Sequence, residues 1–220
     1  ALMARVASKK TLLDWGYGPP ESTWVRSWQE VCDWKEKTRS LAAVLKAPLD
    51  SSGRGNFFIR WSDGDSMQAA ISSQAKLLFE KHEGMILQPW WERIADFSSQ
   101  WIVGQKPRLV GSTLLLNSSR GRYLGSLCGP EGWLESFLGR FWIMHEKMAV
   151  PLLQRLYAEG YEGPCGIDSM IVKTGYRLEC VPIVEINPRH TMGWVAVQLQ
   201  SQSGRSSTFS WSHQATQGLF

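Results

Sequence analysis

Two strand-like runs near the end of the chain constrain its fold most. One is IDSMIV, and the other is LECVPIVEIN, which ends at Asn187. Side chains alternate between the faces of a strand, so Glu185 and Asn187 project to the same side. A hairpin centred near residues 176 and 177 would place Asp168 opposite Glu185, and would pair apolar residues beyond them: Met170 with Ile183 and Val172 with Val181.

This pairing brings acidic side chains together and therefore predicts a cation. Two carboxylates placed directly opposite each other repel, so the arrangement needs a positive charge between them. Carboxylate and amide oxygens suit a hard cation such as Mg²⁺, which takes one or two carboxylates together with substrate phosphates. The structural alternative is that Glu185 caps the next helix and Asp168 begins a strand at the surface.

Composition limits the class of protein. The chain has 220 residues, of which 43% are hydrophobic and 20% charged, as in globular proteins that bury a substantial core. A net charge of +4 without a basic block argues against a nucleic-acid partner and suits an anionic small molecule. No apolar run reaches the length of a membrane span, and the N-terminus is no secretory signal. The four cysteines form no CxxC pair, which predicts reduced thiols in a cytoplasmic protein.

The order of strands and helices predicts an α+β chain. One helix is expected over 3–15, and a second over 27–38 begins at Ser27 with Glu30 in the capping-box position. A long helix over 133–159 should kink or restart at Pro151. The Ser/Gln/Gly-rich tail is expected to be irregular. The expected parts are an N-terminal helix and connector, a small lobe and a larger sheet lobe, at 1–20, 21–88 and 89–220.

Lys46 ends an apolar strand and precedes a Ser/Gly-rich loop. Such a lysine can place an ammonium group, and the loop several backbone N–H groups, around phosphate oxygens. The segment is not the Walker pattern, because no GK[ST] follows the glycines and no helix follows the loop. A glycine hairpin with a basic neighbour is the structural alternative.

The run MILQPWW is expected to be a strand that ends at a proline. Because Pro89 cannot continue a ladder, backbone groups near Gln88 are candidates for an adenine-binding hinge. Asp96 could accept hydrogen bonds from a ribose. A surface aspartate, and a Trp90 packed in a core, are the structural alternatives.

The order of these features resembles the ATP-grasp superfamily, which includes biotin carboxylase and D-alanine–D-alanine ligase. The segments VLKAPLDSSGRG and GID…VEINPR carry most of the resemblance, which covers about residues 5 to 200. It implies an ATP-grasp fold, in which two α+β lobes with mostly antiparallel sheets hold ATP between them.

The resemblance also implies a role for each group of residues. Lys46 would contact the ATP phosphates, as would Lys9, with Lys10 as the adjacent candidate. The lid over the phosphates would consist of Ser51, Ser52, Gly53 and Gly55. The adenine hinge would be Gln88, Pro89 and Trp90, with Asp96 on the ribose. The Mg²⁺ ligands would be Asp168, Glu185 and Asn187, and Arg189 would face the transferred phosphoryl group.

The implied activity is that of an ATP-dependent ligase with Mg²⁺, or Mn²⁺, as its cation. A substrate carboxylate attacks the γ-phosphate of ATP, giving an acyl-phosphate and ADP, and an amine or another nucleophile then displaces phosphate. Lys46 and Arg189 would be the catalytic residues. A small-molecule kinase and a non-catalytic nucleotide-binding module are the alternatives on this fold. The resemblance names neither the substrates nor the oligomeric state.

Two departures from the family pattern stand out. Family members usually carry a further α/β domain before this module, and that domain is missing from this sequence, so an inactive fragment is one alternative. Gly166 stands where some members place a basic residue, and Arg120 and Arg122 are candidates to replace it.

Overall fold

The computed structural model describes residues 2–49, 56–61, 65–118, 123–203 and 208–212. The chain divides into two compact units: a smaller one, Ser8–Glu92, and a larger one, Ala1–Ala7 with Arg93–Phe220. The N-terminal part expected over 1–20 is therefore divided between the two units. The single helix expected over 3–15 is two helices, α1 (Leu2–Val6) and α2 (Lys9–Asp14), because the side chain of Ser8 caps α2.

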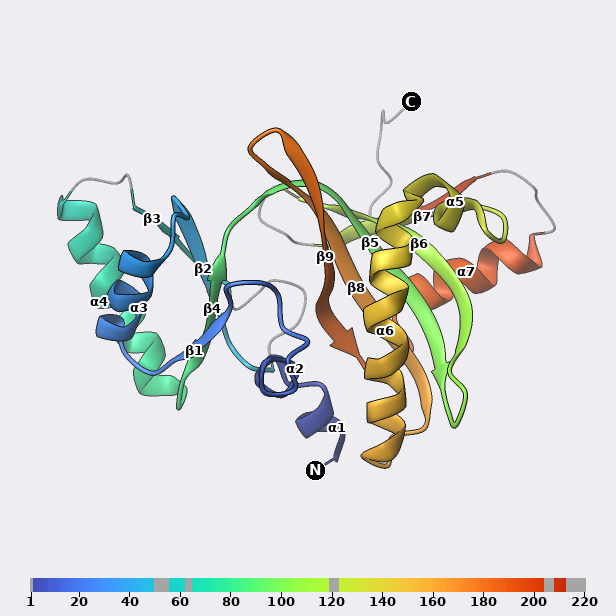
Figure 1. The fold of residues 1–220 in the computed structure, drawn as a ribbon, viewed down its shortest axis with the longest axis horizontal. Helices are drawn as coiled ribbons and strands as arrows, with labels where there is room; N and C mark the ends of the chain where they lie inside the picture. Colours follow the sequence, from blue (N-terminus) through green and yellow to red (C-terminus); the bar gives the residue numbers. More distant parts are fainter. Residues whose placement is uncertain (1, 50–55, 62–64, 119–122, 204–207, 213–220) are drawn as a thin grey trace. The chain divides into compact units, whose positions relative to one another are not determined.

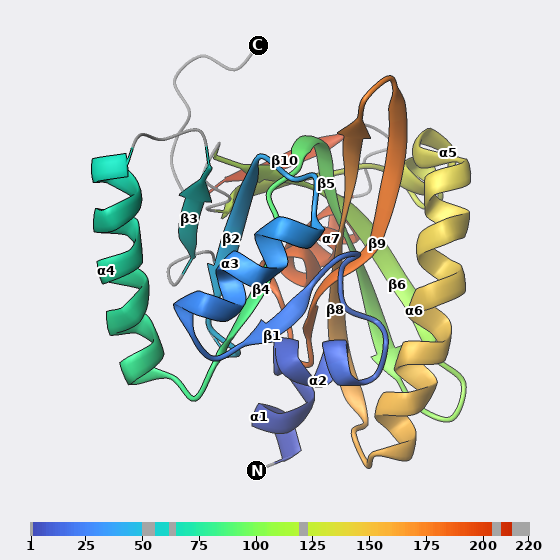
Figure 2. The ribbon, with the colours of Figure 1, turned by 60° about the vertical axis from the view of Figure 1, so that its left-hand side comes forward.

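The smaller unit is a sheet covered by two helices (Figure 2). Its described strands are β1 (Thr23–Val25), β2 (Ala42–Lys46), β3 (Phe57–Arg60) and β4 (Met85–Pro89), paired antiparallel in the order β1-β4-β2-β3. Helices α3 (Trp28–Lys37) and α4 (Asp65–Lys81) supply Val31, Ile71 and Ala75 to a core that also contains Leu45 and Leu87. This burial of apolar surface stabilises the unit.

Strand alternation divides the two faces of this sheet. Ala43 and Leu45 of β2 belong to the core beneath α3 and α4. Val44 and Lys46 therefore project from the opposite face, and the register pairs them with Gln88 and Ile86 of β4.

The predicted start of α3 is confirmed. The Ser27 hydroxyl accepts a hydrogen bond from the Glu30 backbone N–H at 3.3 Å, and the Glu30 carboxylate accepts from the Arg26 backbone N–H at 2.9 Å. In a standard capping box the Glu30 carboxylate would accept from the backbone N–H of Ser27 itself. Here it accepts from Arg26, one residue before the cap. Both bonds satisfy backbone donors that lie outside the helical pattern.

The larger unit is built on a second sheet, flanked by helices (Figure 1). In the described residues its strand order is β10-β7-β6-β5-β8-β9. The strands are β5 (Glu92–Val103), β6 (Arg108–Asn117), β7 (Tyr123–Cys128), β8 (Gly163–Thr174), β9 (Arg177–Asn187) and β10 (Phe209–Ser212). The helices are α5 (Trp133–Leu138), α6 (Arg140–Ala158) and α7 (Met192–Gln202).

Helices α6 and α7 cover opposite faces of this sheet (Figure 1). On β5, Phe97 and Ser99 contact His145 of α6. Ser98 and Gln100 point the other way, and Gln100 accepts a hydrogen bond from Thr191, the residue that caps α7. The alternation of β5 therefore separates a core-facing side from a side that leads to Asp168.

Two expectations for the larger unit were wrong. The helix expected over 133–159 breaks at Gly139, whose φ of 52° is left-handed, while Pro151 lies inside the continuous α6. The tail is not wholly irregular, because β10 pairs antiparallel with β7. Glycine conformation and pairing between distant segments decide these two features.

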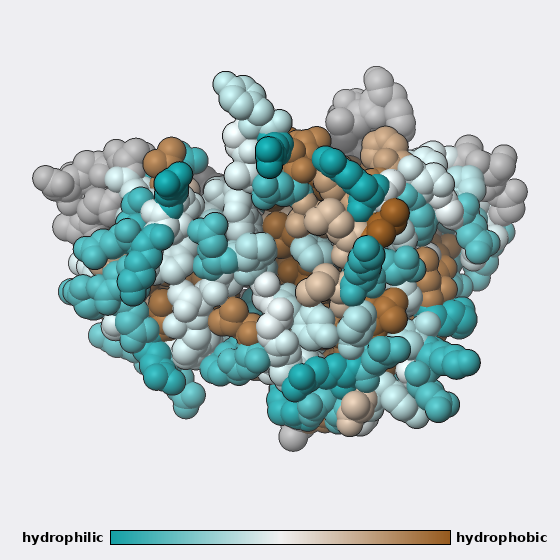
Figure 3. All heavy atoms as spheres, in the orientation of Figure 1, coloured by the Kyte–Doolittle hydropathy of each residue, from teal (hydrophilic) through white to brown (hydrophobic). Residues whose placement is uncertain are grey.

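Across the described ranges, no helix is both long enough and apolar enough to cross a membrane. On the face drawn in Figure 3, hydrophobic residues occur in small groups among polar ones. Scattered exposed apolar residues are ordinary on a folded protein.

Candidate active site

The larger unit holds a pair of acidic residues on neighbouring strands. The register of β8 and β9 places Asp168 directly opposite Glu185 and Gly166 opposite Asn187. Nearer the turn the register differs from the expected one: Met170 pairs with Val181 rather than with Ile183, and Val172 with Glu179 rather than with Val181.

An irregularity near Pro182 explains the difference. Pairing shifts between Asp168 and Met170, and the Ser169 hydroxyl donates to the Pro182 carbonyl at 2.7 Å. Proline has no N–H for the ladder, so a break in pairing is expected at this position. The hairpin turns one residue earlier than expected, at Gly175 (φ 61°), and the irregularity restores the Asp168–Glu185 pair.

Both carboxylate oxygens of Asp168 accept hydrogen bonds from neutral side chains. Ser98 donates to Oδ1 at 2.7 Å, and the Asn187 amide donates to Oδ2 at 3.2 Å. The side-chain oxygen of Asn187, Oδ1, in turn accepts a hydrogen bond from the Arg189 guanidinium at 3.1 Å. The orientation of Asp168 is therefore set by residues from β5 and β9.

The environment of Asp168 disfavours its charge. Burial first, then the nearby Glu185 carboxylate and to a smaller extent Asp96, raise the pKa of Asp168 to about 7. The Ser98 hydrogen bond and the Arg189 charge act in the opposite direction and lower the pKa. Negative charge thus accumulates here without full compensation by the protein's own cations.

The residues present fit a magnesium ion. Two facing carboxylates and an amide are hard oxygen donors, and the raised pKa of Asp168 is the effect that a bound cation would reverse. No group of three His, Cys, Asp or Glu side chains suited to a metal occurs in the described part of the chain. A set with two carboxylates matches Mg²⁺, which fills its remaining positions with water and phosphate oxygens.

The structure removes one alternative for Glu185. The cap of α7 is Thr191, whose hydroxyl accepts from the Trp194 backbone N–H at 3.1 Å. Glu185 therefore does not cap the helix that follows it. Arg189, from the same connection, is exposed, and its side chain reaches back to Asn187.

Asp96 lies on β5 in the larger unit with two donors on one oxygen. Oδ2 accepts from the Asn117 amide at 2.9 Å and from Arg93 at 3.3 Å. The side chain is only 16% exposed, so it is not the simple surface aspartate of the structural alternative.

The smaller unit places Lys46 and Gln88 on one face of its sheet. Lys46 ends β2 opposite Ile86, and Gln88, which is 3% exposed, lies opposite Val44. The predicted lid residues lie outside the described residues: Ser51, Ser52, Gly53 and Gly55. Arg120 and Arg122 also lie outside them.

Of the two adjacent lysines, Lys9 is buried and Lys10 is partly exposed. The Lys9 backbone N–H donates to the Pro48 carbonyl at 3.0 Å, which ties the start of α2 to the segment after Lys46. The Lys10 ammonium is bound by Asp14 at 2.6 Å. The two side chains therefore have different environments.

The strand β4 ends at Pro89, as expected, but backbone bonding to β2 continues for one further residue. Pro89 pairs with Ala43, and the Trp90 backbone N–H donates to the Ala42 carbonyl at 2.9 Å. On its other side, β4 pairs with β1 only as far as Leu87 in the described residues. The Trp90 ring packs edge-on against Phe58, with centroids 4.6 Å apart.

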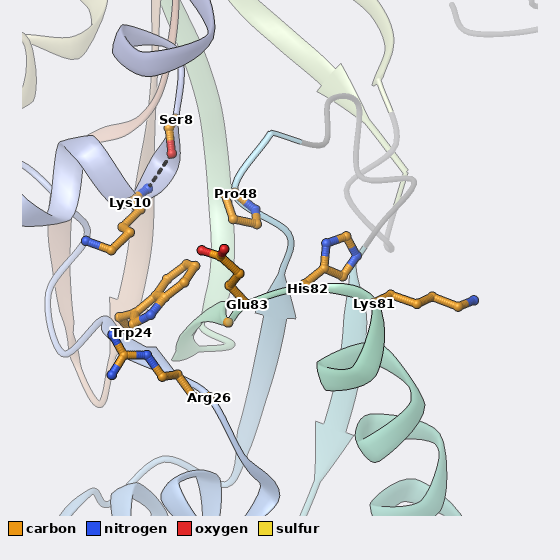
Figure 4. A pocket seen from close by; sticks show the side chains of 9 residues that line it. Ser8, Lys10, Trp24, Arg26, Pro48, Lys81, His82 and Glu83 are labelled. Carbon is orange, nitrogen blue, oxygen red and sulfur yellow. Dashed lines mark hydrogen bonds between the residues drawn. The ribbon is translucent and has the colours of Figure 1, made fainter.

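A cavity of about 410 Å³ opens elsewhere in the smaller unit (Figure 4). Trp24 lies between Lys10 and Glu83 in this view, with Arg26 beside it. Neither Lys46 nor Gln88 is among the residues that line it. Of the nucleotide-binding candidates, Lys10 lines this cavity, while Lys46 and the hinge residues do not.

Sequence reasoning missed the polar residues of β5 that support Asp168. Ser98, Ser99 and Gln100 are all at most 2% exposed and follow one another in the middle of a central strand. A run of polar residues between Phe97 and Trp101 was the available signal, because buried polar groups require partners.

Comparison with known proteins identifies the fold. No protein-family profile and no curated protein sequence matches the chain. N5-carboxyaminoimidazole synthetase from Staphylococcus aureus, solved with ADP, is 13% identical with a TM-score of 0.63, over 90% of this chain and 48% of that one. Biotin carboxylase from Campylobacter jejuni, solved with a β,γ-ATP ligand, is 17% identical with a TM-score of 0.63, over 90% of this chain and 43% of that one.

The match is partial with respect to these enzymes. Pyruvate carboxylase from Rhizobium etli, at 18% identity and a TM-score of 0.61, also matches 90% of this chain but only 17% of its own. The chain thus spans less than half the length of each of these structures. The α+β architecture with its two mostly antiparallel sheets is the one that these enzymes share, and the chain has the ATP-grasp fold.

Proposed function

We propose that the chain is the ATP-binding and phosphoryl-transfer module of an ATP-dependent ligase that activates a substrate carboxylate as an acyl-phosphate. The observation that carries this proposal is the facing pair of Asp168 and Glu185, in which burial and the neighbouring Glu185 carboxylate raise the pKa of Asp168. The ATP-grasp fold supports it, because the similar structures were solved with ADP or an ATP ligand.

In this proposal Asp168, Glu185 and Asn187 hold a magnesium ion, or manganese in its place. The cation would neutralise charge on the phosphate oxygens when bound. Arg189 would stabilise the negative charge that develops on the transferred phosphoryl group, since a guanidinium presents several donors to its oxygens. Its contact with Asn187 supports this role, because it ties the guanidinium to one of the proposed ligands.

We assign the remaining candidates to nucleotide binding. Lys46 and Lys9 would neutralise the phosphates, and Asp96 would accept from the ribose. The hinge would be Gln88, Pro89 and Trp90, and the lid Ser51, Ser52, Gly53 and Gly55. The common face of Lys46 and Gln88 supports this assignment. The Trp90 backbone N–H is already bonded to Ala42, so it is not available to adenine. The hinge would therefore contact adenine through backbone carbonyl groups or through the Gln88 side chain.

Calorimetric titration of the full 220-residue chain with ADP in the presence of Mg²⁺ tests the site. Glu185→Gln should weaken binding at least about tenfold, a loss of about 1.4 kcal/mol. Glu179→Gln is the matched control, because it makes the same charge change on an exposed residue of the same strand. Absence of Mg²⁺-dependent binding in the unaltered chain, or equal loss in both variants, would refute the metal site.

Hydroxylamine trapping tests the reaction class. With ATP, Mg²⁺ and a panel of carboxylic acids, an acyl-phosphate is captured as a hydroxamate. A stable phosphorylated product without hydroxamate would indicate a kinase. Binding without any ATP consumption would indicate a non-catalytic module, or a piece that requires the rest of a longer enzyme.

A further inference from the structure

A continuous series of hydrogen bonds joins the start of α7 to Asp168. Thr191 Oγ1 donates to Gln100 Oε1 at 2.7 Å, and Gln100 Nε2 donates to Ser98 Oγ at 2.8 Å. Ser98 Oγ then donates to Asp168 Oδ1 at 2.7 Å. Residues from β5, β8 and the cap of α7 are therefore connected through a single glutamine side chain.

The direction of every bond in this series follows from its ends. The Trp194 backbone N–H can only donate, so it uses Thr191 Oγ1 as acceptor and leaves the Thr191 hydrogen for Gln100. At the other end an ionised Asp168 can only accept, so Ser98 must give it a hydrogen and accept from the Gln100 amide. Both ends therefore require the same orientation of the Gln100 amide.

Close packing holds Gln100 in this orientation. Gln100 is fully buried, and Ser98 is 2% exposed. A Cβ atom added at Gly193 would lie 2.6 Å from Gln100 Nε2, and one added at Gly166 would lie 2.6 Å from Thr191 Cγ2. The two glycines thus leave just enough space for the Gln100–Thr191 pair, and a larger residue at Gly166 would displace it.

We propose that Gln100 is a positioning residue that fixes the Asp168 carboxylate for its cation. By orienting the Ser98 hydroxyl, Gln100 anchors Oδ1, while Asn187 anchors Oδ2. Thr191 makes this orientation depend on the start of α7. This inference rests on the proposed function, because it assigns Asp168 to a magnesium site.

The test uses Mn²⁺ as the probe in the presence of ADP, with the full chain. Water proton relaxation gives the dissociation constant for the bound ion without any turnover. Gln100→Leu and Thr191→Val should each weaken Mn²⁺ binding about tenfold, as is usual when a partner of a metal ligand is lost. Thr191→Ser keeps the hydroxyl and should restore the affinity of the unaltered chain.

Two matched controls separate positioning from general damage. Thr113→Val makes the same change as Thr191→Val on a fully buried hydroxyl for which no hydrogen-bond partner is found in the described residues. Ser99→Ala removes a buried hydroxyl from the other face of β5, where it contacts His145. Both should bind Mn²⁺ like the unaltered chain, with near-ultraviolet circular dichroism reporting the fold of every variant.

The possible failures are distinguishable. If the unaltered chain does not bind Mn²⁺ with ADP, the proposed function fails and this inference fails with it. If the unaltered chain binds but folded Gln100→Leu and Thr191→Val bind equally well, only the positioning role of Gln100 is overturned. Equal weakening in Thr113→Val would also overturn it, since packing alone would then explain the loss.

Discussion

Asp168 lies directly opposite Glu185 across β8 and β9, and its two carboxylate oxygens are held by Ser98 and Asn187. This relationship places two negative charges together and at the same time fixes the direction of one of them. Repulsion between the charges is a cost to the folded chain in the absence of a cation. A cation bound between the two carboxylates would offset this repulsion, which is consistent with the proposed metal site.

Asp168→Asn should stabilise the larger unit at high pH and have little effect at low pH. The pKa of Asp168 is raised from 3.8 to about 7, so the folded chain binds more protons than the unfolded chain between these values. The contribution of Asp168 to stability is therefore greatest below pH 4 and decreases as pH rises to 7. Urea unfolding at pH 8 without divalent cations should show a gain on the order of 2 kcal/mol.

The Glu179→Gln variant serves as control for this change, because Glu179 is exposed near the other end of β9. It should differ little from the unaltered chain at either pH. An equal effect of Asp168→Asn at pH 4 and pH 8 would contradict the raised pKa.

His145→Phe should lower stability at pH 7 and remove a loss of stability in acid. The His145 Nδ1 lies 2.9 Å from the Pro182 carbonyl, which can only accept, so this nitrogen carries the proton of a neutral ring. Replacing it leaves the buried Ser99 and Ser169 hydroxyls without this partner, at a cost of about 1–3 kcal/mol.

The acid dependence follows from the pKa of His145, which burial lowers from 6.5 to about 4. Between these values the unfolded chain binds more protons, so His145 lowers stability as pH falls from 6.5 to 4. Urea unfolding at pH 7 and pH 4.5 should show that this decrease is smaller in His145→Phe. A decrease of the same size would indicate that other groups cause it.

Gly84→Ala should destabilise the smaller unit. A Cβ atom there would lie 2.5 Å from the Trp24 ring, and overpacking of this kind typically costs about 1–3 kcal/mol. Gly104→Ala is the control, since the nearest atom to its added Cβ is a flexible Glu162 oxygen at 3.9 Å. Thermal unfolding followed by tryptophan fluorescence should separate the two variants, and similar midpoints would argue against the packing of Trp24 on Gly84.

Lys9→Met should weaken ADP binding, whereas Lys10→Met should not. Lys9 is buried at the start of α2, and its backbone is bonded to Pro48. Lys10 is already paired with Asp14 at 2.6 Å. Loss of a phosphate contact should reduce the affinity about tenfold, which corresponds to about 1.4 kcal/mol. Calorimetric titration with ADP and Mg²⁺ measures the affinity of both variants. A larger loss in Lys10→Met than in Lys9→Met would assign the phosphate contact to Lys10 instead.

The opposition of Asp168 and Glu185 could be predicted from the sequence, but the register of the whole hairpin could not. Alternation with a period of two places the acidic residues and Asn187 on one side. The assumed turn was one residue too late, and the irregularity at Pro182 compensated for that error. Local sequence patterns do not reveal how much pairing is lost around a proline.

The start of α3 and the strands β2 and β3 were also predictable, because capping and apolar alternation act between near neighbours in sequence. The break at Gly139 was not, and neither was the place of Pro151 inside α6, because the packing around a helix decides where it is interrupted. The pairing of β10 with β7 joins segments about eighty residues apart, which no local pattern specifies.

By itself the sequence indicated the residues that we propose for the chemistry, since Asp168, Glu185, Asn187, Arg189 and Lys46 stand out as polar groups within or beside apolar strands. Only the tertiary structure decided how Asp168 is held. Ser98, Gln100 and Thr191 come from segments up to 93 positions apart in the numbering, and they meet because β5 lies beside β8 and the start of α7 reaches Gln100. These hydrogen bonds join residues 70 and 91 positions apart, and they form only when the strands and α7 are packed together. The periodic pattern of apolar residues in the sequence does not show which distant residues will meet.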